Sequence, residues 1–341
     1  MIAANETKSG SLKGLSEVVG IDFGATGTKV VRMKRSKEGL LITGVTELSP
    51  VTLETSNEQC VNFSLPKSVR SRNVAFAYSG RGAIVRLVNV PGFSRNSANA
   101  DDTVRSQVGL DRGYRLGYTI TSLAGRGKQE VSLIAVGVPS EETEWLLELV
   151  TKTGPSPVSM EVSALASLTA FVRGPANKTV DGAVGIIEAG EQVTMLAIFS
   201  NGDPILLRKF EFGYDQILDR VSRQFGVDRV TAHSVLSEHS IDVSQPVQEA
   251  VGSFLRQLAI SKEFVERKVG TQVREWFLTG GLANADYWRE KISKTVGKEA
   301  QVWNPLGNLF LAQDVWPSEL EGQEVRFSAA IGLAIGALED A

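Results

Sequence analysis

The sequence is poor in the residues that form disulfide frameworks and zinc clusters. Its 341 residues include one cysteine, Cys60, and two histidines, His233 and His239. A single cysteine excludes an intrachain disulfide framework and indicates a reducing, cytoplasmic compartment. The two histidines fall on different faces of any shared helix, which argues against a zinc cluster.

Long apolar runs are also missing. Residues 1–13 are polar and small, without an apolar core of signal-peptide length, so we expect residues 1–16 to form a disordered leader. The longest apolar stretch, residues 329–338, is about half of the roughly 20 residues that span a bilayer. We expect this stretch to be a buried helix, and we expect no direct insertion into a membrane.

Charge of one sign is not in large excess. The chain has 36 lysines and arginines against 39 acidic residues and a formal net charge of -3. With no dense basic run, this balance predicts neither nucleic-acid binding nor a polybasic membrane anchor. Hydrophobic residues make up 42% of the chain and 33 glycines outnumber 11 prolines, which is typical of a turn-rich α/β globular protein. The length predicts two domains.

The clearest local pattern is a glycine turn between two apolar runs at residues 17–33. Val18-Val19-Gly20-Ile21 leads into the turn and Val30-Val31 leads out of it, which predicts a β-hairpin. A dinucleotide-binding fold would have a helix after its glycine turn, and a P-loop would need Gly-Lys-Ser/Thr. The pattern excludes both.

Strands and helices alternate along the rest of the chain. We expect helices at 140–153, 214–225 and 244–268, and a strand leading into an apolar helix at 157–171. Residues 96–112 are predicted to be helical or irregular. Further strands are predicted at 40–45, 74–78, 83–90, 130–138, 204–210 and 276–283.

The first hairpin has a counterpart later in the chain, at a constant offset of 166 residues. Both copies have an acidic residue, a glycine and a threonine at the same spacing after an apolar strand: Asp22, Gly24 and Thr28, then Glu188, Gly190 and Thr194. The sequence therefore predicts an internal duplication. The Gly- and Pro-containing linker 172–179 predicts the boundary between a first lobe, 17–180, and a second lobe, 181–341.

Three glycine turns, at 22–27, 188–192 and 279–282, each follow an apolar strand and can therefore meet at one cleft. Glycine lets backbone N–H groups approach phosphate oxygens closely. Asp22 and Glu188 would face each other across the cleft, where they can hold a hydrated Mg²⁺ or orient an attacking water. We assign both as candidate catalytic and metal-binding residues. One such turn alone is usually only a hairpin, so the hypothesis depends on all three.

Several motifs resemble those of one known group. Gly20-Ile21-Asp22-Phe23-Gly24 and the residues up to Val31 are similar to the first phosphate motif of the actin-like ATPases, and Leu278-Thr279-Gly280-Gly281 resembles their adenosine motif. Residues 88–91, 158–170 and 303–306 resemble further motifs of the PilM family of type IV pilus assembly proteins, relatives of FtsA. The resemblance covers nearly the whole chain after the leader.

This resemblance implies an α/β, actin-like (ribonuclease H-like) ATPase fold with two duplicated lobes. It implies a small inserted α+β subdomain at about 75–157 in the first lobe and a helical subdomain at about 215–274 in the second. ATP or ADP would bind with Mg²⁺ between the lobes. The nucleotide-binding residues that it implies are Gly24, Ala25, Thr26, Gly27, Thr28, Lys29, Gly190, Glu191, Thr194, Gln257, Ser261, Gly280, Gly281 and Leu282.

The resemblance also implies partners. Members of the family lie on the cytoplasmic face of the inner membrane and bind the short N-terminal tail of the membrane protein PilN. PilO-like and pilus motor components and self-association are further implied contacts. The implied role is to signal nucleotide state to the pilus machinery, or to a related secretion system.

Two residues depart from the family's pattern. Glu188 stands where the second phosphate motif has aspartate, and the extra methylene moves the carboxylate by roughly 1.5 Å. Gln257 aligns with a glutamate that meets the ribose hydroxyls, and it can donate or accept hydrogen bonds without a charge. We therefore expect nucleotide binding with slow or absent hydrolysis.

Three alternative interpretations remain. A sugar or small-metabolite kinase shares the fold and the first motif, but it needs an aspartate base at the sugar site. An FtsA-like filament former ends in a linker and a basic amphipathic helix, whereas this sequence ends directly after its last apolar helix. A scaffold that keeps the fold without binding ATP is the third.

Overall fold

The structure is a computed structural model that describes residues 14–51, 63–94, 97–121, 130–152, 154–174, 182–238, 241–270 and 272–339. The predicted leader therefore lies outside the described residues except for residues 14–16. Cys60, His239 and most of the predicted linker 172–179 also lie outside them.

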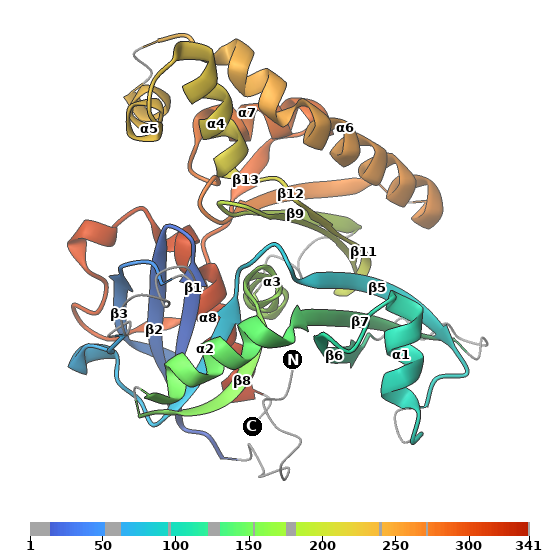
Figure 1. Ribbon diagram of the computed structural model, residues 1–341, viewed down its shortest axis with the longest axis vertical. Helices are drawn as coiled ribbons and strands as arrows, with labels where there is room; N and C mark the ends of the chain where they lie inside the picture. Colours follow the sequence, from blue (N-terminus) through green and yellow to red (C-terminus); the bar gives the residue numbers. More distant parts are fainter. Residues whose placement is uncertain are drawn as a thin grey trace.

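The first lobe is built on a six-stranded sheet with the order β14-β3-β2-β1-β4-β8 (Figure 1). Strands β1, β2 and β3 are antiparallel neighbours, while β4 pairs parallel with β1 and β8 parallel with β4. The strands are β1 (Glu17–Gly24), β2 (Gly27–Arg35), β3 (Leu40–Leu48), β4 (Asn73–Tyr78), β8 (Ser156–Val162) and β14 (Phe310–Leu311).

The second lobe repeats this topology in a five-stranded sheet with the order β11-β10-β9-β12-β13. Its strands are β9 (Ala183–Ala189), β10 (Thr194–Ser200), β11 (Asp203–Phe210), β12 (Val273–Thr279) and β13 (Ala300–Val302). The two hairpins also share a register. Asp22 lies opposite Lys29 in the first hairpin, and Glu188 lies opposite Met195 in the second, so each residue of the second pair follows its equivalent by 166 residues. The predicted internal duplication is confirmed.

Helices α3 (Ser163–Arg173) and α8 (Ser328–Glu339) lie between the two sheets (Figure 1). The inner strands β1 and β9 are apolar along nearly their whole length because helices or strands cover both of their faces. Phe171 of α3 contacts Phe199, Phe277 and Trp303 of the second lobe, with ring centroids 5.4–6.1 Å apart. Around α3 the lobes therefore share one apolar core.

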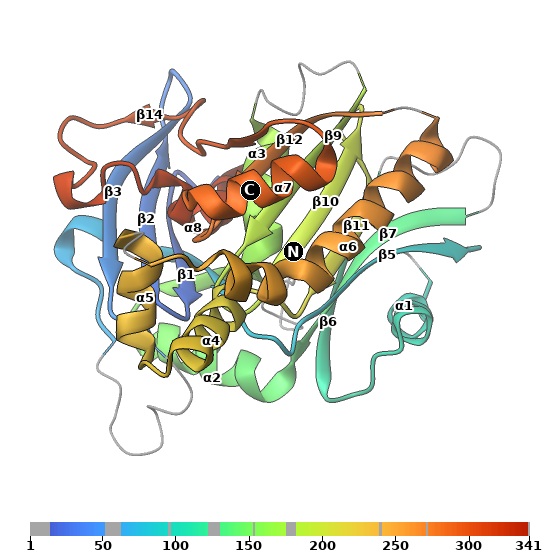
Figure 2. The ribbon, with the colours of Figure 1, turned by 90° about the horizontal axis from the view of Figure 1, so that it is seen from above.

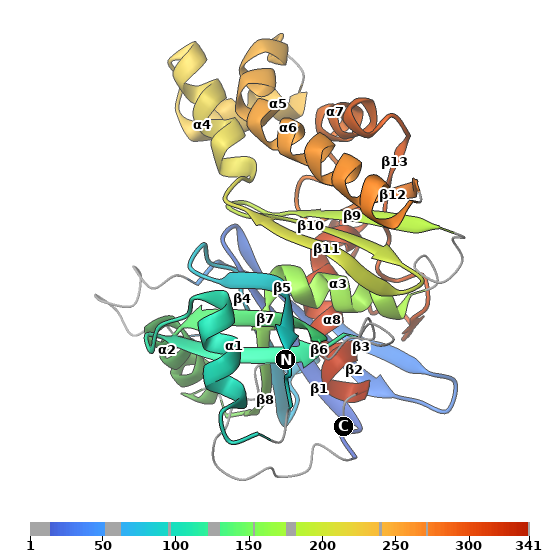
Figure 3. The same cartoon turned by 90° about the vertical axis from the view of Figure 1, so that its right-hand side faces the viewer.

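A three-stranded sheet with the order β5-β7-β6 is separate from both larger sheets in its strand pairing, and its strand β5 lies beside β11 of the second lobe (Figure 3). Its strands run from Ile84 to Pro139, inside the predicted range 75–157, and the limits of the inserted subdomain stay a prediction. The sequence did not predict β6, and α2 packs on β8 of the main sheet and on β6 and β7. The elements are β5 (Ile84–Pro91), α1 (Ala100–Val108), β6 (Tyr114–Ile120), β7 (Glu130–Pro139) and α2 (Ser140–Lys152).

Helices α6 and α7 cover the outer face of the second-lobe sheet, and α4 and α5 lie beside them, with α4 packed on α6 and α5 packed on α4 (Figure 2). They are α4 (Tyr214–Phe225), α5 (Arg229–Glu238), α6 (Ser244–Val269) and α7 (Asp286–Val296). The sequence predicted α4 and α6 but neither α5 nor α7. The lobe boundaries at 180/181 and the helical subdomain limits of 215–274 stay predictions.

The apolar C-terminal stretch forms α8, which is buried as predicted. No helix in the described ranges has both the length and the apolar composition to cross a membrane. A short 3-10 helix, Glu324–Phe327, leads into α8 from the second lobe. Thr279 at the end of β12 donates its hydroxyl hydrogen to the Val325 carbonyl (3.3 Å), so this segment joins the two lobes beside the third glycine turn.

Candidate nucleotide site

The three glycine turns meet at a cavity of about 830 Å³ between the lobes. In the second lobe, β9 and β12 are parallel neighbours and end in register at Glu188 and Thr279, so the second and third turns lie side by side. The first turn joins β1 to β2 of the other sheet. Of the candidate residues, the cavity is lined by Asp22, Gly24, Ala25, Thr26, Lys29, Glu188, Gly190, Glu191, Gly280, Gly281 and Leu282.

The first turn places a carboxylate and a cation side by side. Ser163, at the start of α3, donates a hydrogen bond to Asp22 Oδ1 (2.5 Å). Burial raises the pKa of Asp22, although the neighbouring Lys29 ammonium and the Ser163 hydroxyl act in the opposite direction. Lys29 donates to the Gly27 carbonyl (3.0 Å) and pairs with Glu47 (3.5 Å). Burial lowers the pKa of Lys29, so this ammonium is poorly solvated and suited to meet an anion.

The second turn contributes Glu188 to the cavity. Burial, and after it the negative charge of Asp22, raises the pKa of Glu188 to about 8. Asp22 and Glu188 both line the cavity, and their placement across it stays a prediction. Two like charges in one cleft favour either a proton or a cation between them.

The third turn is bound to the second. The Leu282 amide donates to the Ala189 carbonyl (3.2 Å), and Thr279 lies in register with Glu188. Gly280 has a φ of +86°, and a Cβ there would lie 2.5 Å from the Ala189 carbonyl oxygen, so this position requires glycine. Gly281 instead faces open space in the cavity.

Three of the candidate residues act behind the turns and do not line the cavity. Thr28 and Thr194 are fully buried, and their hydroxyls donate to the carbonyls of Ser49 (3.2 Å) and Phe212 (2.8 Å). A Cβ on Gly27 would lie 2.4 Å from Glu47 Oε1, so glycine there admits the Glu47 carboxylate beside Lys29. Their positions indicate structural roles in shaping the turns.

Gln257 and Ser261 do not lie at the cavity. Both side chains accept hydrogen bonds from Arg208 of β11, at 3.1 and 2.7 Å. Successive residues of a strand point to opposite faces, so Arg208 points toward α6 while Lys209 points into the cavity. The alignment selected α6 as the helix beside the ligand, whereas the structure places α4 and α5 there.

The other end of the cavity is aromatic, and the sequence did not predict it. Tyr214 of α4 and His233 of α5 share a hydrogen bond between the hydroxyl and Nδ1 (2.6 Å). Tyr287 of α7 also lines the cavity, and its buried hydroxyl has no hydrogen-bond partner within the described ranges. Aromatic and aliphatic walls with a few polar atoms are typical of a site for a planar ring.

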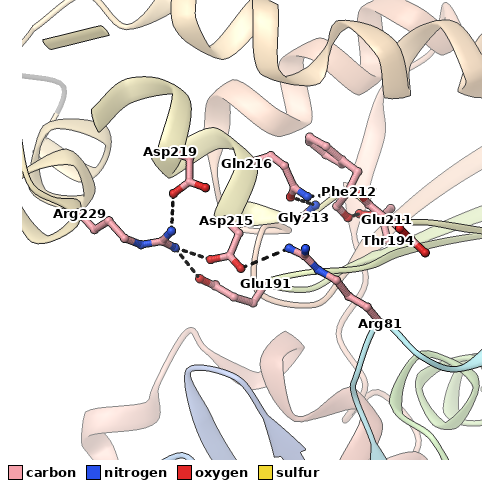
Figure 4. A network of polar contacts seen from close by, with 10 residues as sticks. All are labelled: Arg81, Glu191, Thr194, Glu211, Phe212, Gly213, Asp215, Gln216, Asp219 and Arg229. Atoms are coloured by element: carbon pink, nitrogen blue, oxygen red, sulfur yellow. Dashed lines mark hydrogen bonds and ion pairs between the residues drawn. The ribbon is translucent and has the colours of Figure 1, made fainter. Parts of the chain in front are cut away.

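Arg229 of α5 joins three acidic side chains at the edge of the cavity (Figure 4). It pairs with Asp215 and Asp219 of α4 and, at 3.7 Å, with Glu191 of the second turn. Burial and the hydrogen-bonded Asp215 carboxylate raise the pKa of Glu191 to about 7. Arg326, before α8, binds Glu47 (2.6 Å) on the first-lobe side, so cations from both lobes surround the turns.

The raised pKa of Glu188 predicts a pH-dependent stability. The folded protein holds a proton at Glu188 between about pH 4.5 and pH 8 that the unfolded chain releases, so this contribution to stability is lost as pH rises through 8. The Glu188→Gln side chain does not ionise. In EDTA, the free energy of unfolding of this variant minus that of the unaltered protein should therefore grow by about 1–3 kcal/mol from pH 5 to pH 9. Urea unfolding at pH 5, 7 and 9 measures this difference, with Glu130→Gln, an exposed site, as control. Parallel pH dependence of the Glu188→Gln variant and the unaltered protein would contradict the assignment.

Comparisons with known proteins identify the family and the fold. The family model described as Type IV pilus assembly protein PilM matches residues 20–338. A solved structure described as the PilM-PilN type IV pilus biogenesis complex is similar with a TM-score of 0.77 and 18% sequence identity, covering 94% of this chain and 98% of that one. The ethanolamine utilization protein EutJ from Carboxydothermus hydrogenoformans is similar with a TM-score of 0.45 and 13% identity, covering 95% of this chain and 91% of that one.

The first of these structures has the same arrangement of two lobes over nearly its whole length, and the fold is the predicted actin-like fold. The family match extends from the first glycine turn to the last helix. The chain therefore belongs to the PilM family of type IV pilus assembly proteins.

Proposed function

We propose that this protein binds a magnesium nucleotide, ATP or ADP, between its lobes as the actin-like component of a type IV pilus assembly platform or a related secretion system. The observation that supports it best is the cavity itself. Glycine turns from both lobes meet there beside a buried lysine, and an aromatic pocket lies at the other end. Phosphates fit the first part and a purine ring fits the second.

The residues present fit a magnesium ion that is held largely through water. Asp22 and Glu188 are oxygen ligands that line the same cavity, and each has a pKa raised by burial, which a cation between them would reverse. The described residues contain no group of three or more side chains that would hold a metal alone. Bound Mg²⁺ would neutralise phosphate charge, and water and phosphate oxygens would complete its coordination.

We propose that hydrolysis is slow or absent. Without metal, a glutamate with a pKa of about 8 is largely protonated at neutral pH, and with Mg²⁺ beside it the ionised carboxylate would be engaged by the ion and its waters; in neither state is it free to accept a proton from an attacking water. The longer side chain also changes the distance between the carboxyl group and any water beside the terminal phosphate. Glu188 would then contribute to binding more than to turnover.

Titration with a fluorescent ATP analogue and Mg²⁺ tests the proposal. We expect saturable binding that unlabelled ATP displaces and that EDTA weakens. Adenosine without phosphates is the matched control, and it should compete poorly because it reaches only the aromatic end. A protein that shows no saturable binding at high micromolar concentration is a scaffold that has lost the nucleotide.

We also propose a partner: the cytoplasmic N-terminal tail of a PilN-like membrane protein. The similar solved structure is a PilM-PilN complex, and this chain matches it over 94% of its length. Such a contact would place the protein on the cytoplasmic face of the inner membrane through its partner. PilO-like and motor components would then lie within reach, and self-association remains a further hypothesis.

A synthetic peptide copying that tail should raise the melting temperature of the protein, since a ligand that binds only the folded state stabilises it. Differential scanning fluorimetry at increasing peptide concentration measures the shift. A peptide of the same composition in scrambled order should give none. The partner assignment fails if a saturating amount of the native peptide leaves the melting temperature unchanged.

A further inference from the structure

The second lobe holds the segment through which the chain enters the three-stranded sheet. This segment, residues 79–83, connects β4 of the first lobe to β5. Lys209 of β11 donates hydrogen bonds to the carbonyl oxygens of Arg81 and, at 2.5 Å, of Ala83. The Arg81 guanidinium pairs with Asp215 of α4 at 3.7 Å (Figure 4). We call these three contacts the latch.

The second-lobe part of the latch is fixed to the second glycine turn. The amides of Tyr214 and Asp215 donate to the carbonyls of Gly190 (3.1 Å) and Glu191 (2.9 Å). Gly213 packs so closely on the turn that a Cβ would lie 2.4 Å from the Glu191 carbonyl oxygen. Because these backbone contacts leave no slack, a displacement of the turn displaces Asp215 as well.

Two cations of this part of the second lobe also reach the cavity. Arg229 and Lys209 both line the cavity, and Arg229 holds Asp215 while it also reaches Glu191. Arg81 and Asp215 themselves do not line the cavity. A ligand in the cavity therefore meets Lys209 of the latch and the neighbouring Arg229, but not the Arg81–Asp215 ion pair.

The ion pair of the latch is weak compared with the apolar contact between the main sheets. The Arg81 side chain is 47% exposed, and an ion pair at this exposure contributes about 0–1 kcal/mol. The apolar contact around Phe171 is, in contrast, buried. The three-stranded sheet can therefore lose this contact with the second lobe, where β5 also packs beside β11, while the two main sheets keep theirs.

We propose that the latch couples occupancy of the cavity to the position of the three-stranded sheet, with a bound polyphosphate loosening it. This inference depends on the proposed nucleotide binding. Phosphate oxygens compete with Asp215 for Arg229 and with the two carbonyls for Lys209, because charge-assisted hydrogen bonds to an anion are the stronger ones. A ligand shifts an equilibrium only by its differential affinity for two states, and this competition supplies the difference.

Because coupling between two sites is reciprocal, the proposal predicts the direction in which loss of the latch changes nucleotide affinity. If nucleotide loosens the latch, a protein without the Arg81–Asp215 pair binds nucleotide more tightly, by a factor of up to about 5. Arg81→Ala also removes a positive charge near the cavity, and that loss alone would weaken the binding of an anion. A merely electrostatic or structural role of Arg81 therefore predicts the opposite change.

Two measurements on the full chain test the proposal. The first is the affinity of Arg81→Ala and of the control Arg86→Ala, an exposed arginine on β5, for the fluorescent ATP analogue with Mg²⁺. The second is the distance between spin labels at Ser106→Cys on α1 and Lys294→Cys on α7, both exposed, in a Cys60→Ser background. Lys209→Met, which removes the other half of the latch, is measured by distance alone because Lys209 lines the cavity.

We expect nucleotide to shift the distance distribution of the unaltered protein, and the Arg81→Ala and Lys209→Met variants to show that shift without nucleotide. Arg86→Ala should match the unaltered protein in both measurements. Weaker or unchanged affinity of Arg81→Ala, or unchanged distances in both latch variants, would overturn the coupling alone. If the unaltered protein binds no nucleotide, the proposed function fails, and the distances of the nucleotide-free variants still show whether the latch holds the sheet.

Discussion

The Gly332→Ala variant is expected to lose at least about 3 kcal/mol of its free energy of unfolding. Helices α3 and α8 meet at this residue, and a Cβ on Gly332 would lie 1.7 Å from the Ala166 carbonyl oxygen and 2.6 Å from its carbon. Backbone atoms cannot rotate away as a side chain can. The helices would have to separate, and both belong to the core that the two lobes share. Urea unfolding followed by circular dichroism measures the loss.

Gly336→Ala is the matched control, one turn further along α8. A Cβ there would meet only Thr169 Cγ2 at 3.7 Å, an ordinary contact. Alanine is favoured over glycine inside a helix by roughly 0.5–1 kcal/mol, so this variant should be unchanged or slightly more stable. Equal unfolding midpoints for Gly332→Ala and Gly336→Ala would show that α3 and α8 do not approach as closely as described.

The Lys29→Met variant is expected to bind the fluorescent ATP analogue about 100-fold more weakly. Lys29 is a buried cation of the first turn, and a hydrogen bond to a charged group contributes about 1.5–3 kcal/mol, where about 1.4 kcal/mol is a factor of ten. Methionine should fit, because Met195 occupies the equivalent register position in the second hairpin. Glu47 keeps a partner, since Arg326 binds it at 2.6 Å.

Lys34→Met on the same strand is the control for charge, because Lys34 is exposed and lies away from the cavity. Its affinity should equal that of the unaltered protein. Thermal melts of both variants separate lost binding from lost folding. A dissociation constant for Lys29→Met within about threefold of the unaltered value would assign phosphate binding to other residues.

Most elements of the fold could be predicted because the inner strands are apolar and end in glycine turns. Strand β6 and helices α5 and α7 were not predicted. The α5 sequence is rich in valine, threonine, serine and histidine, which are poor helix formers, and the helix depends on packing Ala232, Val235 and Leu236 into the second-lobe core. In β6, Gly117 interrupts the apolar pattern, and the strand is specified by its pairing with β7.

The parts of the candidate site that lie in one local motif could be predicted from the sequence. The parts that come together only in the tertiary fold could not. All three turns are local sequence features, and the structure brings them together. Tyr214, Arg229, His233 and Tyr287 come from three different helices, and no spacing in the sequence relates them. Gln257 and Ser261 were expected at the cavity from the resemblance of α6 to a family helix, whereas residues of α4, α5 and α7 line it.

The register shared by the two hairpins has a consequence for how a ligand lies. A cleft between two identical copies of one hairpin would accept a linear anion in either of two orientations related by the symmetry of the copies. Here one copy carries Lys29 and the other carries Met195 at the equivalent position. One charge-assisted hydrogen bond, about 1.5–3 kcal/mol, favours one orientation at least tenfold. The duplicated hairpins form the two sides of the cleft, and the difference between Lys29 and Met195 determines which way round a linear anion binds.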